Sequence, residues 1–405
     1  MNESAAHGAA EGVVRDSYGR LVAYLAARTG DVAGAEDALG DALAAALQRW
    51  PVDGVPQKPE AWLLRAARNR LIDAGRHDKV IRQTQDFVMQ LTEDSGDTGA
   101  RQAPFPDERL KLLFVCAHPA IDPSVRTPIM LQAVLGLDSA RIASAFLVSP
   151  AAMGQRLVRA KTKIRDAGIP FRVPDPPEWD ERVSFVLDAI YSAYTAGWDG
   201  AARDLAAEAI SLGRTLAALI PREPEALGLL SLMLHCEART AARHSAQGEF
   251  VPLDRQDAAL WSRPMIGEAE GLLRAAAGQG QMGRFQLEAA IQSLHAQRAV
   301  TGNIDWKGIA LIYEGLVRLA PSVGAQVGRA VALAEAGDAG GGLAALGAIP
   351  QDKARGYQPW WAARAHLLEL LGRPREAREA FHRAAALTED AALRAHLLGR
   401  AIAAG

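Results

Sequence analysis

The sequence predicts an all-α protein in which small helical domains are followed by a longer helical array. The apolar fraction is 49% but aromatic residues make up only 6%, so the cores must be rich in alanine and leucine, which favour helices. Apolar side chains recur at helical spacing in successive segments, and capping residues, glycines and prolines separate these segments. Near the C-terminus, two helical segments have turn glycines, Gly337 and Gly372, which are 35 residues apart and indicate repeats.

Length and composition limit the possible functions. A chain of 405 residues predicts two or three domains, and a formal net charge of −2 means that nucleic-acid binding must depend on local basic patches. The two cysteines, Cys116 and Cys236, are far apart, which argues against a disulfide framework and fits a reducing cytoplasm. We find no signal peptide, membrane span, phosphate loop, zinc motif or nucleophile elbow, and we expect no enzyme activity, no metal and no cofactor.

Two helices are expected in the first 50 residues. The first covers 11–29, Gly30 ends it, and Asp31 can cap the second, 32–50. Apolar spacing along the second helix predicts that Trp50 is buried with a face rich in alanine and leucine. The exposed face opens with acidic side chains, which suit the helix dipole. These side chains are Glu36, Asp37 and Asp41.

The third helix begins near Glu60 and has two unlike sides. One side is apolar, and the opposite side carries an aromatic residue and polar groups: Trp62, Arg65, Asn69, Asp73 and Arg76. The segment 61–85 contains six arginines and lysines against two aspartates. An aromatic ring beside cations suits the unstacked bases and phosphates of single-stranded DNA. Alternatively, Trp62 fills the helical core and Asp73 pairs with a neighbouring arginine.

The next segments read as a linker and a short apolar helix. Residues 91–107 are rich in aspartate, glycine and proline, and this composition predicts a flexible linker. The helix that follows contains Cys116 and His118. A metal-binding pair is conceivable, but no third or fourth ligand is evident, so a buried cysteine and a capping histidine are favoured.

Residues 137–170 predict a helix-turn-helix. Asp138 or Ser139 can cap a first short helix, Ser149 can cap the second with Pro150 at its first position, and Gly168 ends it near Asp166. The second helix has a narrow apolar stripe made of Met153, Leu157, Ala160 and Ile164. Beside the stripe lie small residues and then cations, as a helix in the major groove requires: Ala152, Gln155, Arg156, Arg159 and Lys163. The segment 150–172 carries six cations against one aspartate. The alternative is a solvated basic face on a core helix.

The rest of the chain predicts a helical extension. A proline-rich junction at 173–177 marks a domain boundary, and 176–405 is helical throughout. Two stretches fit the tetratricopeptide pattern of small residues where two helices cross. The first contains Ala330, Leu333, Gly337 and Leu346, and the second contains Trp361, Ala365, Leu368, Gly372, Ala377, Phe381 and Ala384.

Three stretches together resemble the bacterial extracytoplasmic-function (ECF) sigma factors: Glu36 to Trp50, Trp62 to Arg76, and Ile142 to Arg165 with its RLVRAKTKIR sequence. FVCAHPAI and PREPEALGLLSLML resemble a subgroup with a long helical extension that has tetratricopeptide-like repeats. The resemblance implies a sigma region 2 domain at 1–90, a linker at 91–107, a region 4 helix-turn-helix domain at 108–172 and the extension at 176–405.

The same resemblance implies roles for individual residues. Core polymerase would be contacted by Glu36, Asp37, Asp41 and Trp50. The −10 element would be contacted by Trp62, Arg65, Asn69, Asp73 and Arg76. The −35 element would be contacted by Ser149, Ala152, Gln155, Arg156, Arg159, Lys161 and Lys163.

Two functions remain open at this point. The first is a sigma factor whose extension contacts the promoter-reading domains within the same chain and regulates them. The second is a DNA-binding adaptor whose repeats bind a partner protein without polymerase. Paired basic helices, one of them after an acidic helix, favour the sigma factor, because an adaptor needs only the helix-turn-helix.

Overall fold

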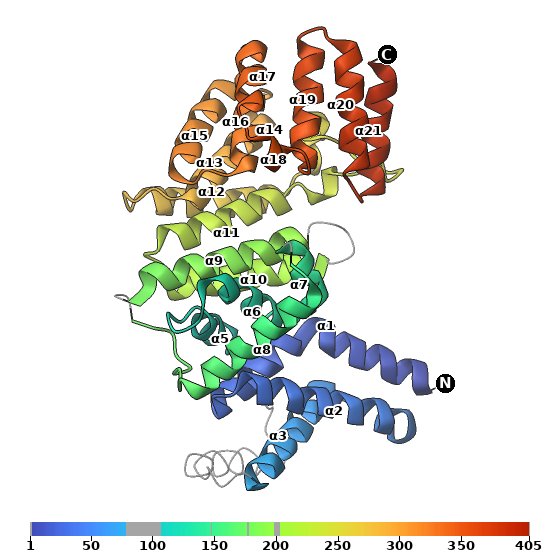
Figure 1. Ribbon diagram of the computed structural model, residues 1–405, viewed down its shortest axis with the longest axis vertical. Coiled ribbons are helices and arrows are strands. Elements are labelled where there is room, and N and C mark those ends of the chain that lie inside the picture. The colour runs from blue at the N-terminus through green and yellow to red at the C-terminus, as the bar shows by residue number, and fades with distance from the viewer. Residues whose placement is uncertain (1, 78–106, 147, 176–177, 198–202, 405) are drawn as a thin grey trace. The chain divides into compact units, whose positions relative to one another are not determined.

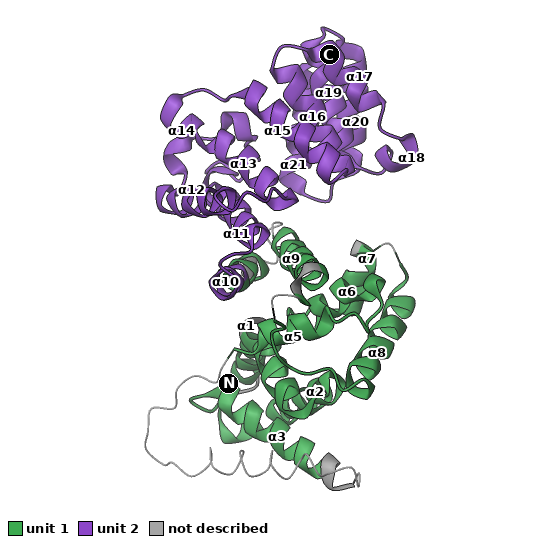
Figure 2. Ribbon diagram, turned by 90° about the vertical axis from the view of Figure 1, so that its left-hand side faces the viewer, with its two compact units in different colours: residues 1–212 green, residues 213–405 purple. Residues whose placement is uncertain are grey.

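The computed structural model describes the chain except for residues 1, 78–106, 147, 176–177, 198–202 and 405 (Figure 1). The predicted all-α class is confirmed: every regular element among the described residues is a helix, and an isolated antiparallel bridge joins His244 and Phe250. The chain forms two compact units, 1–212 and 213–405, which are coloured separately in Figure 2. No helix in the described part is both long and apolar enough to cross a membrane.

Unit 1 contains two groups of helices and the start of the extension. The first group is α1 (Asn2–Thr29), α2 (Val32–Asp53) and α3 (Pro59–His77). The second is α5 (Arg109–Cys116), α6 (Pro123–Ala133), α7 (Ser139–Ala145) and α8 (Pro150–Asp166). They are followed by α9 (Trp179–Ala196) and α10 (Arg203–Leu219), and the boundary between the units falls inside α10.

Helices α1 to α3 pack on one another around an alanine- and leucine-rich core. The structure extends α1 nine residues further toward the N-terminus than the predicted 11–29, because alanines continue the helix and Ala6 and Ala10 are buried. α2 ends at Asp53, after which Gly54 adopts a φ of 88°. The predicted third helix begins at Pro59 as expected, but its last predicted turns lie outside the described residues, as do the linker residues 91–106.

The predicted punctuation of α7 and α8 is confirmed. The Asp138 side chain accepts hydrogen bonds from the backbone N–H groups of Ala140 and Arg141, both at 2.9 Å. Ser149 Oγ accepts one from the backbone N–H of Ala152 at 3.3 Å. Beyond the end of α8, Gly168 has a φ of 58°, which favours glycine and stops the helix. Caps of this kind each stabilise a helix by about 1 kcal/mol.

The start of the extension packs on the second group of helices. α9 lies against α5 and α6. Arg126 Nη1 of α6 is 2.5 Å from Glu181 Oε1 of α9, and its guanidinium lies 4.6 Å from the ring centre of Phe185. The chain therefore does not divide into compact units at the proline-rich junction 173–177, although that junction was the boundary expected from composition.

Unit 2 is a series of helices whose bounds are α11 Pro224–Glu237, α12 Arg263–Ala277, α13 Arg284–Ala296, α14 Arg298–Thr301, α15 Trp306–Leu319, α16 Val323–Glu335, α17 Ala339–Gly347, α18 Gln351–Ala354, α19 Gln358–Leu370, α20 Pro374–Ala386 and α21 Ala391–Ala403. Three short 3-10 helices lie between α11 and α12: Thr240–Ala242, Leu253–Arg255 and Ala258–Leu260.

The two predicted glycine turns join neighbouring helices in unit 2. Gly337 separates α16 from α17 with a φ of 109°, and Gly372 separates α19 from α20 with a φ of 67°. The residues predicted for the second stretch gather in one core cluster with α21, among them Ala365, Phe381 and Ala384. Small residues of this kind let the backbones of crossing helices approach closely.

Candidate nucleic-acid interface

One edge of α8 is exposed and cationic. The apolar stripe is buried, with Met153, Leu157, Ala160 and Ile164 all at most 5% exposed, and this burial fixes the orientation of the helix. The exposed side chains are those expected from the pattern: Gln155, Arg156, Arg159 and Lys163. Ala152 is half-buried, and the exposed Ser149 is occupied as the helix cap. A polyanion could therefore contact this edge without disturbing the buried apolar stripe of α8.

The cationic edge borders a groove at the start of α6. The groove has a volume of about 480 Å³, and its lining includes Arg156, Arg159 and Lys163 together with Asp122 and Ser124. The Asp122 carboxylate caps α6 and accepts hydrogen bonds from the Ser124 hydroxyl at 2.6 Å and the Ser124 N–H at 2.8 Å, and these two bonds hold its pKa below the usual value. Three cations against one carboxylate leave the groove suited to a phosphate.

Lys161 does not lie on this exposed edge, and here the expected −35 set needs correction. Its side chain is only 10% exposed, and its ammonium donates a hydrogen bond to Glu36 Oε2 of α2. The reason is its position one turn after Leu157, which turns it toward the first group of helices together with the apolar stripe. In this arrangement the Lys161 ammonium is buried in an ion pair with Glu36 and is not accessible to DNA.

The acidic side chains of α2 fall into two kinds. Glu36 is 12% exposed, and its burial raises the pKa of the carboxyl, which Lys161 only partly offsets. Asp37 and Asp41 are exposed, and Asp41 Oδ2 lies 4.0 Å from Arg70 Nε of α3. A partner protein could reach these two aspartates directly, whereas Glu36 would have to be released by Lys161 first.

Trp50 is not available to a partner either, which corrects its expected polymerase contact. It is 1% exposed and packs edge-on against Trp62, with ring centres 5.6 Å apart at an interplanar angle of 70°. Burial of Trp50 is what the apolar spacing of α2 predicted. Trp62 is half-buried, so its ring partly fills the helical core, as the alternative interpretation proposed.

The polar side of α3 is partly open to solvent. Arg65, Asn69 and Asp73 are exposed, while the side chain of Arg76 lies outside the described part of the structure. The pattern did not single out Arg68, whose guanidinium donates to the Tyr24 hydroxyl of α1. Arg68 lies one helical turn after Arg65 and next to the buried Ala67, and this position close to the apolar side of α3 was the available signal.

The contact between the two helix groups depends on residues that the sequence did not reveal. Gly19 of α1 lies against the backbone of Val134, so that an added Cβ would collide with the Val134 carbonyl oxygen. Next to it, the ring of Tyr18 faces Gly136, which has a φ of 67°. A glycine inside an apolar helix was the available signal of a close backbone approach.

The pair Cys116 and His118 has the structural roles favoured from the sequence. Cys116 is fully buried, and burial raises the pKa of its thiol. His118 Nδ1 accepts a hydrogen bond from the backbone N–H of Ala120 at 3.1 Å, so it caps the turn after α5. Across the residues that the structure describes, no cluster of three or more histidine, cysteine, aspartate or glutamate side chains is arranged to hold a metal ion.

Comparison with known protein families assigns the first group of helices to a described family model. Residues 13–80 match the family model of Sigma-70 region 2, and residues 182–277 match a family of unknown function, DUF6596. The chain is 39% identical over 378 residues to the uncharacterized protein R00370 of Rhizobium meliloti (strain 1021), covering 90% of this chain and 88% of the relative. No solved structure matches the chain.

The Sigma-70 region 2 match covers α1 from residue 13 onward and all of α2 and α3, and these helices carry Asp37, Asp41 and the polar side of α3. It supports a sigma-factor-like role in binding RNA polymerase. The chain therefore belongs to the same family as R00370 of Rhizobium meliloti and carries an N-terminal Sigma-70 region 2, which supports a sigma-70 family factor.

Proposed function

We propose that this protein is a sigma factor of the ECF type that binds core RNA polymerase, recognises −35 and −10 promoter DNA and initiates transcription. The observation that carries the proposal is the Sigma-70 region 2 match over α1 to α3. The factor would act where the polymerase is, in the cytoplasm.

The exposed edge of α8 would hold the −35 duplex, with α7 and α8 acting as the helix-turn-helix. Arg156, Arg159 and Lys163 share one exposed edge next to the groove at the start of α6, so their charges can act on the same backbone. Gln155 is exposed beside them and could read a base edge. Lys161 joins this set only if it leaves Glu36.

Helices α2 and α3 would supply the polymerase contact and the −10 contact. Near the start of α2, Asp37 and Asp41 are exposed carboxylates that a partner can reach, unlike Glu36. On α3, Arg65, Asn69 and Asp73 form the open polar side, with Trp62 at its start. An exposed amide and a guanidinium beside a partly open indole suit a displaced single strand.

We further propose that residues 176–405, with helical repeats of the tetratricopeptide type, regulate the promoter-reading domains through contacts within the chain. Support comes from unit 1, where α9 of this extension packs on α5 and α6 and Glu181 pairs with Arg126. Because the tether is covalent, even a weak interface would be occupied. Glu181→Ala should therefore change promoter-dependent transcription, whereas Ser184→Ala, at an exposed neighbouring position, should not. Equal transcription from both variants and the parent would contradict regulation through this contact.

The main test is run-off transcription with the full chain and core RNA polymerase. The protein should co-elute with the core enzyme and direct initiation from a promoter. Arg156→Ala should weaken promoter binding by about 1–3 kcal/mol if the contact is specific to a base. A uniform loss with a smaller salt dependence would mean a phosphate contact instead.

The matched control is Arg318→Ala, which removes an exposed arginine of α15 outside the region 2 match. This variant should transcribe like the parent. If the protein binds DNA but neither co-elutes with core polymerase nor supports initiation, the adaptor interpretation replaces the sigma-factor proposal.

A further inference from the structure

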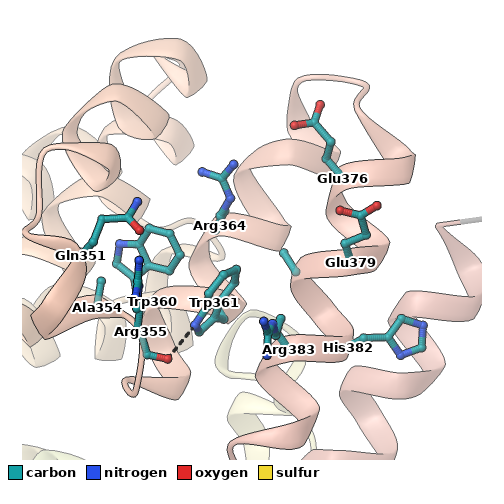
Figure 3. Close-up of a pocket in the computed structure, with 11 residues that line it drawn as sticks. Gln351, Ala354, Arg355, Trp360, Trp361, Arg364, Glu376, Glu379, His382 and Arg383 are labelled. Atoms are coloured by element: carbon teal, nitrogen blue, oxygen red, sulfur yellow. Dashed lines mark hydrogen bonds between the residues drawn. The ribbon is translucent and has the colours of Figure 1, made fainter.

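A groove in unit 2 lies between α18, α19 and α20. Its volume is about 620 Å³, and its lining includes three arginines, two tryptophans and two glutamates (Figure 3). The groove is built entirely from residues 351–383, so it lies outside the helices proposed to contact polymerase and promoter DNA.

The cations in this groove have no carboxylate partners of their own. Arg355, Arg364 and Arg383 take part in no ion pair among the described residues, although two glutamates, Glu376 and Glu379, line the same groove. Glu376 is held by Arg373, with Nε and Oε1 2.6 Å apart. Three arginines against two glutamates, one of which is paired with Arg373 outside the lining, leave the groove with an excess of positive charge.

The aromatic wall of the groove is held rigid. Trp360 Nε1 donates to the Leu346 carbonyl at 3.1 Å, and Trp361 Nε1 donates to the Arg355 carbonyl at 3.1 Å. The two rings pack edge-on, with centres 4.8 Å apart. Both indole N–H groups are already satisfied and need no polar partner from a ligand. Trp360 is buried, so the apolar surface that a ligand can reach is that of the half-buried Trp361.

Two of the arginines are placed beside these rings. The Arg364 guanidinium lies 5.7 Å from the ring centre of Trp360, and that of Arg383 lies 5.9 Å from the ring centre of Trp361. Contact with an aromatic ring orients a guanidinium while leaving its N–H groups free to donate. A carboxylate entering the groove would meet donors that are already positioned.

The glutamates of α20 decide which kind of anion fits. Glu376, Glu379 and Arg383 follow one another along the face of α20 that borders the groove, and Figure 3 shows the glutamates at one end and Arg383 at the other. A nucleic-acid backbone would place phosphates against Glu376 and Glu379 and be repelled. A peptide can place an acidic side chain at the arginines and a neutral or basic one at the glutamates.

We propose that this groove binds an acidic peptide segment of a partner protein. Its carboxylates would accept hydrogen bonds from Arg355, Arg364 and Arg383, and an apolar neighbour would pack on Trp361, which is half-buried and therefore partly open. Each charge-assisted contact that is lost should cost the complex about a factor of ten.

The test measures binding of a labelled peptide to the full chain. The probe is an acetylated and amidated octapeptide in which aspartate and leucine alternate, and its control has asparagine in place of aspartate. We expect saturable binding of the aspartate peptide that weakens at high salt. Arg364→Ala and Arg383→Ala should each weaken it about tenfold. Arg378→Ala, which removes an exposed arginine of α20 that does not line the groove, should leave it unchanged.

Far-UV circular dichroism establishes that each variant is folded, and Arg383→Gln repeats the measurement with a more conservative change. No saturable binding, or equal binding of the asparagine peptide, overturns the proposal. So does competition by an oligothymidine or by inorganic phosphate that depends on Arg364, since it would identify a general anion site.

Discussion

The two compact units bury polar groups in opposite ways. In unit 1, Lys161 and Glu36 are both nearly buried, and each supplies the charge that the other needs. In unit 2, the side chain of His235 of α11 is fully buried near Glu270 of α12. Neither of its ring nitrogens finds a hydrogen-bond partner among the described residues. The nearest carboxylate oxygen, Glu270 Oε1, is 3.6 Å from Nε2, which is too far for a hydrogen bond.

The Lys161–Glu36 pair and the buried His235 depend on different conditions for their stability. A buried ion pair between two helices is held by its partners and by the close packing around it, so removing one partner strands the other. A buried histidine is instead tolerated because it can stay neutral. Unit 1 should therefore respond to loss of packing or of a partner, and unit 2 to protons.

The largest loss of stability should come from adding a side chain at the close contact between α1 and the end of α6. Gly19→Ala places a Cβ against the Val134 carbonyl oxygen, and since backbone atoms cannot move aside cheaply, we expect a loss of about 3 kcal/mol in the free energy of unfolding. Gly12→Ala is the matched control in the same helix, because an added Cβ there meets nothing within 4 Å. It should be neutral or stabilise by up to about 1 kcal/mol. Urea denaturation measures both, and equal stabilities would show that the helices do not touch at Gly19.

The next effect should come from the ion pair. Lys161→Met leaves Glu36 buried without its cation, which should destabilise unit 1 by about 2–3 kcal/mol. The double variant Glu36→Gln with Lys161→Met should recover much of this loss, since no charge is then stranded. Lys163→Met, on the exposed edge of α8, is the control and should change stability by less than about 0.5 kcal/mol. If Lys161→Met behaves like this control, the ion pair contributes nothing to stability.

Per side chain, the smallest effect is a pH dependence in unit 2. Burial, with help from Arg239, lowers the pKa of His235 to about 4, and burial lowers that of His295 to about 4 as well. The unfolded chain binds these protons near pH 6.5 and the folded chain does not, so stability is complete at neutral pH and falls as the pH drops from 6.5 toward 4. Each histidine should cost roughly 2 kcal/mol at pH 5.

His235→Phe removes one of the two titrating groups. The slope of unfolding free energy against pH between 6.5 and 4 should then fall by about one proton relative to the parent. The control is substitution of His382, an exposed histidine of α20, by glutamine, which should leave the slope unchanged. A parent protein with no slope in this range would contradict the neutral buried histidines.

Local features of the fold could be predicted because they depend on residues that are close together in the sequence. The caps of α7 and α8, the end of α8 at Gly168 and the turn at Gly372 each depend on a side chain or a φ value within a few positions. Burial of Trp50 followed from helical periodicity in the same way. These patterns also predicted which side chains of α8 are exposed, namely Gln155, Arg156, Arg159 and Lys163. Lys161 entered the expected −35 set only through the family resemblance.

Contacts across long stretches of chain could not be predicted. Glu36 and Lys161 are 125 positions apart. The spacing of α8 places Lys161 one turn after Leu157, beside the apolar stripe, but it does not say which carboxylate the ammonium meets. The tightness of packing at Gly19 depends on where the turn after α6 lies, which no local pattern fixes. The charge distribution of a helix identifies the surface it could offer, and only the packing of its neighbours decides which of those charges remain on that surface.

The two native thiols have a practical consequence for following the separation of α2 from α8. Cys116 and Cys236 are the only cysteines of the chain, both are buried, and burial raises the pKa of both. Thiolates are scarce at such sites, so alkylating reagents react slowly there. A pair of cysteines introduced at Gln48 of α2 and Thr162 of α8, both exposed, can therefore carry donor and acceptor dyes without removing the native cysteines. The distance between α2 and α8 then becomes an optical signal that can be recorded while polymerase or DNA is added.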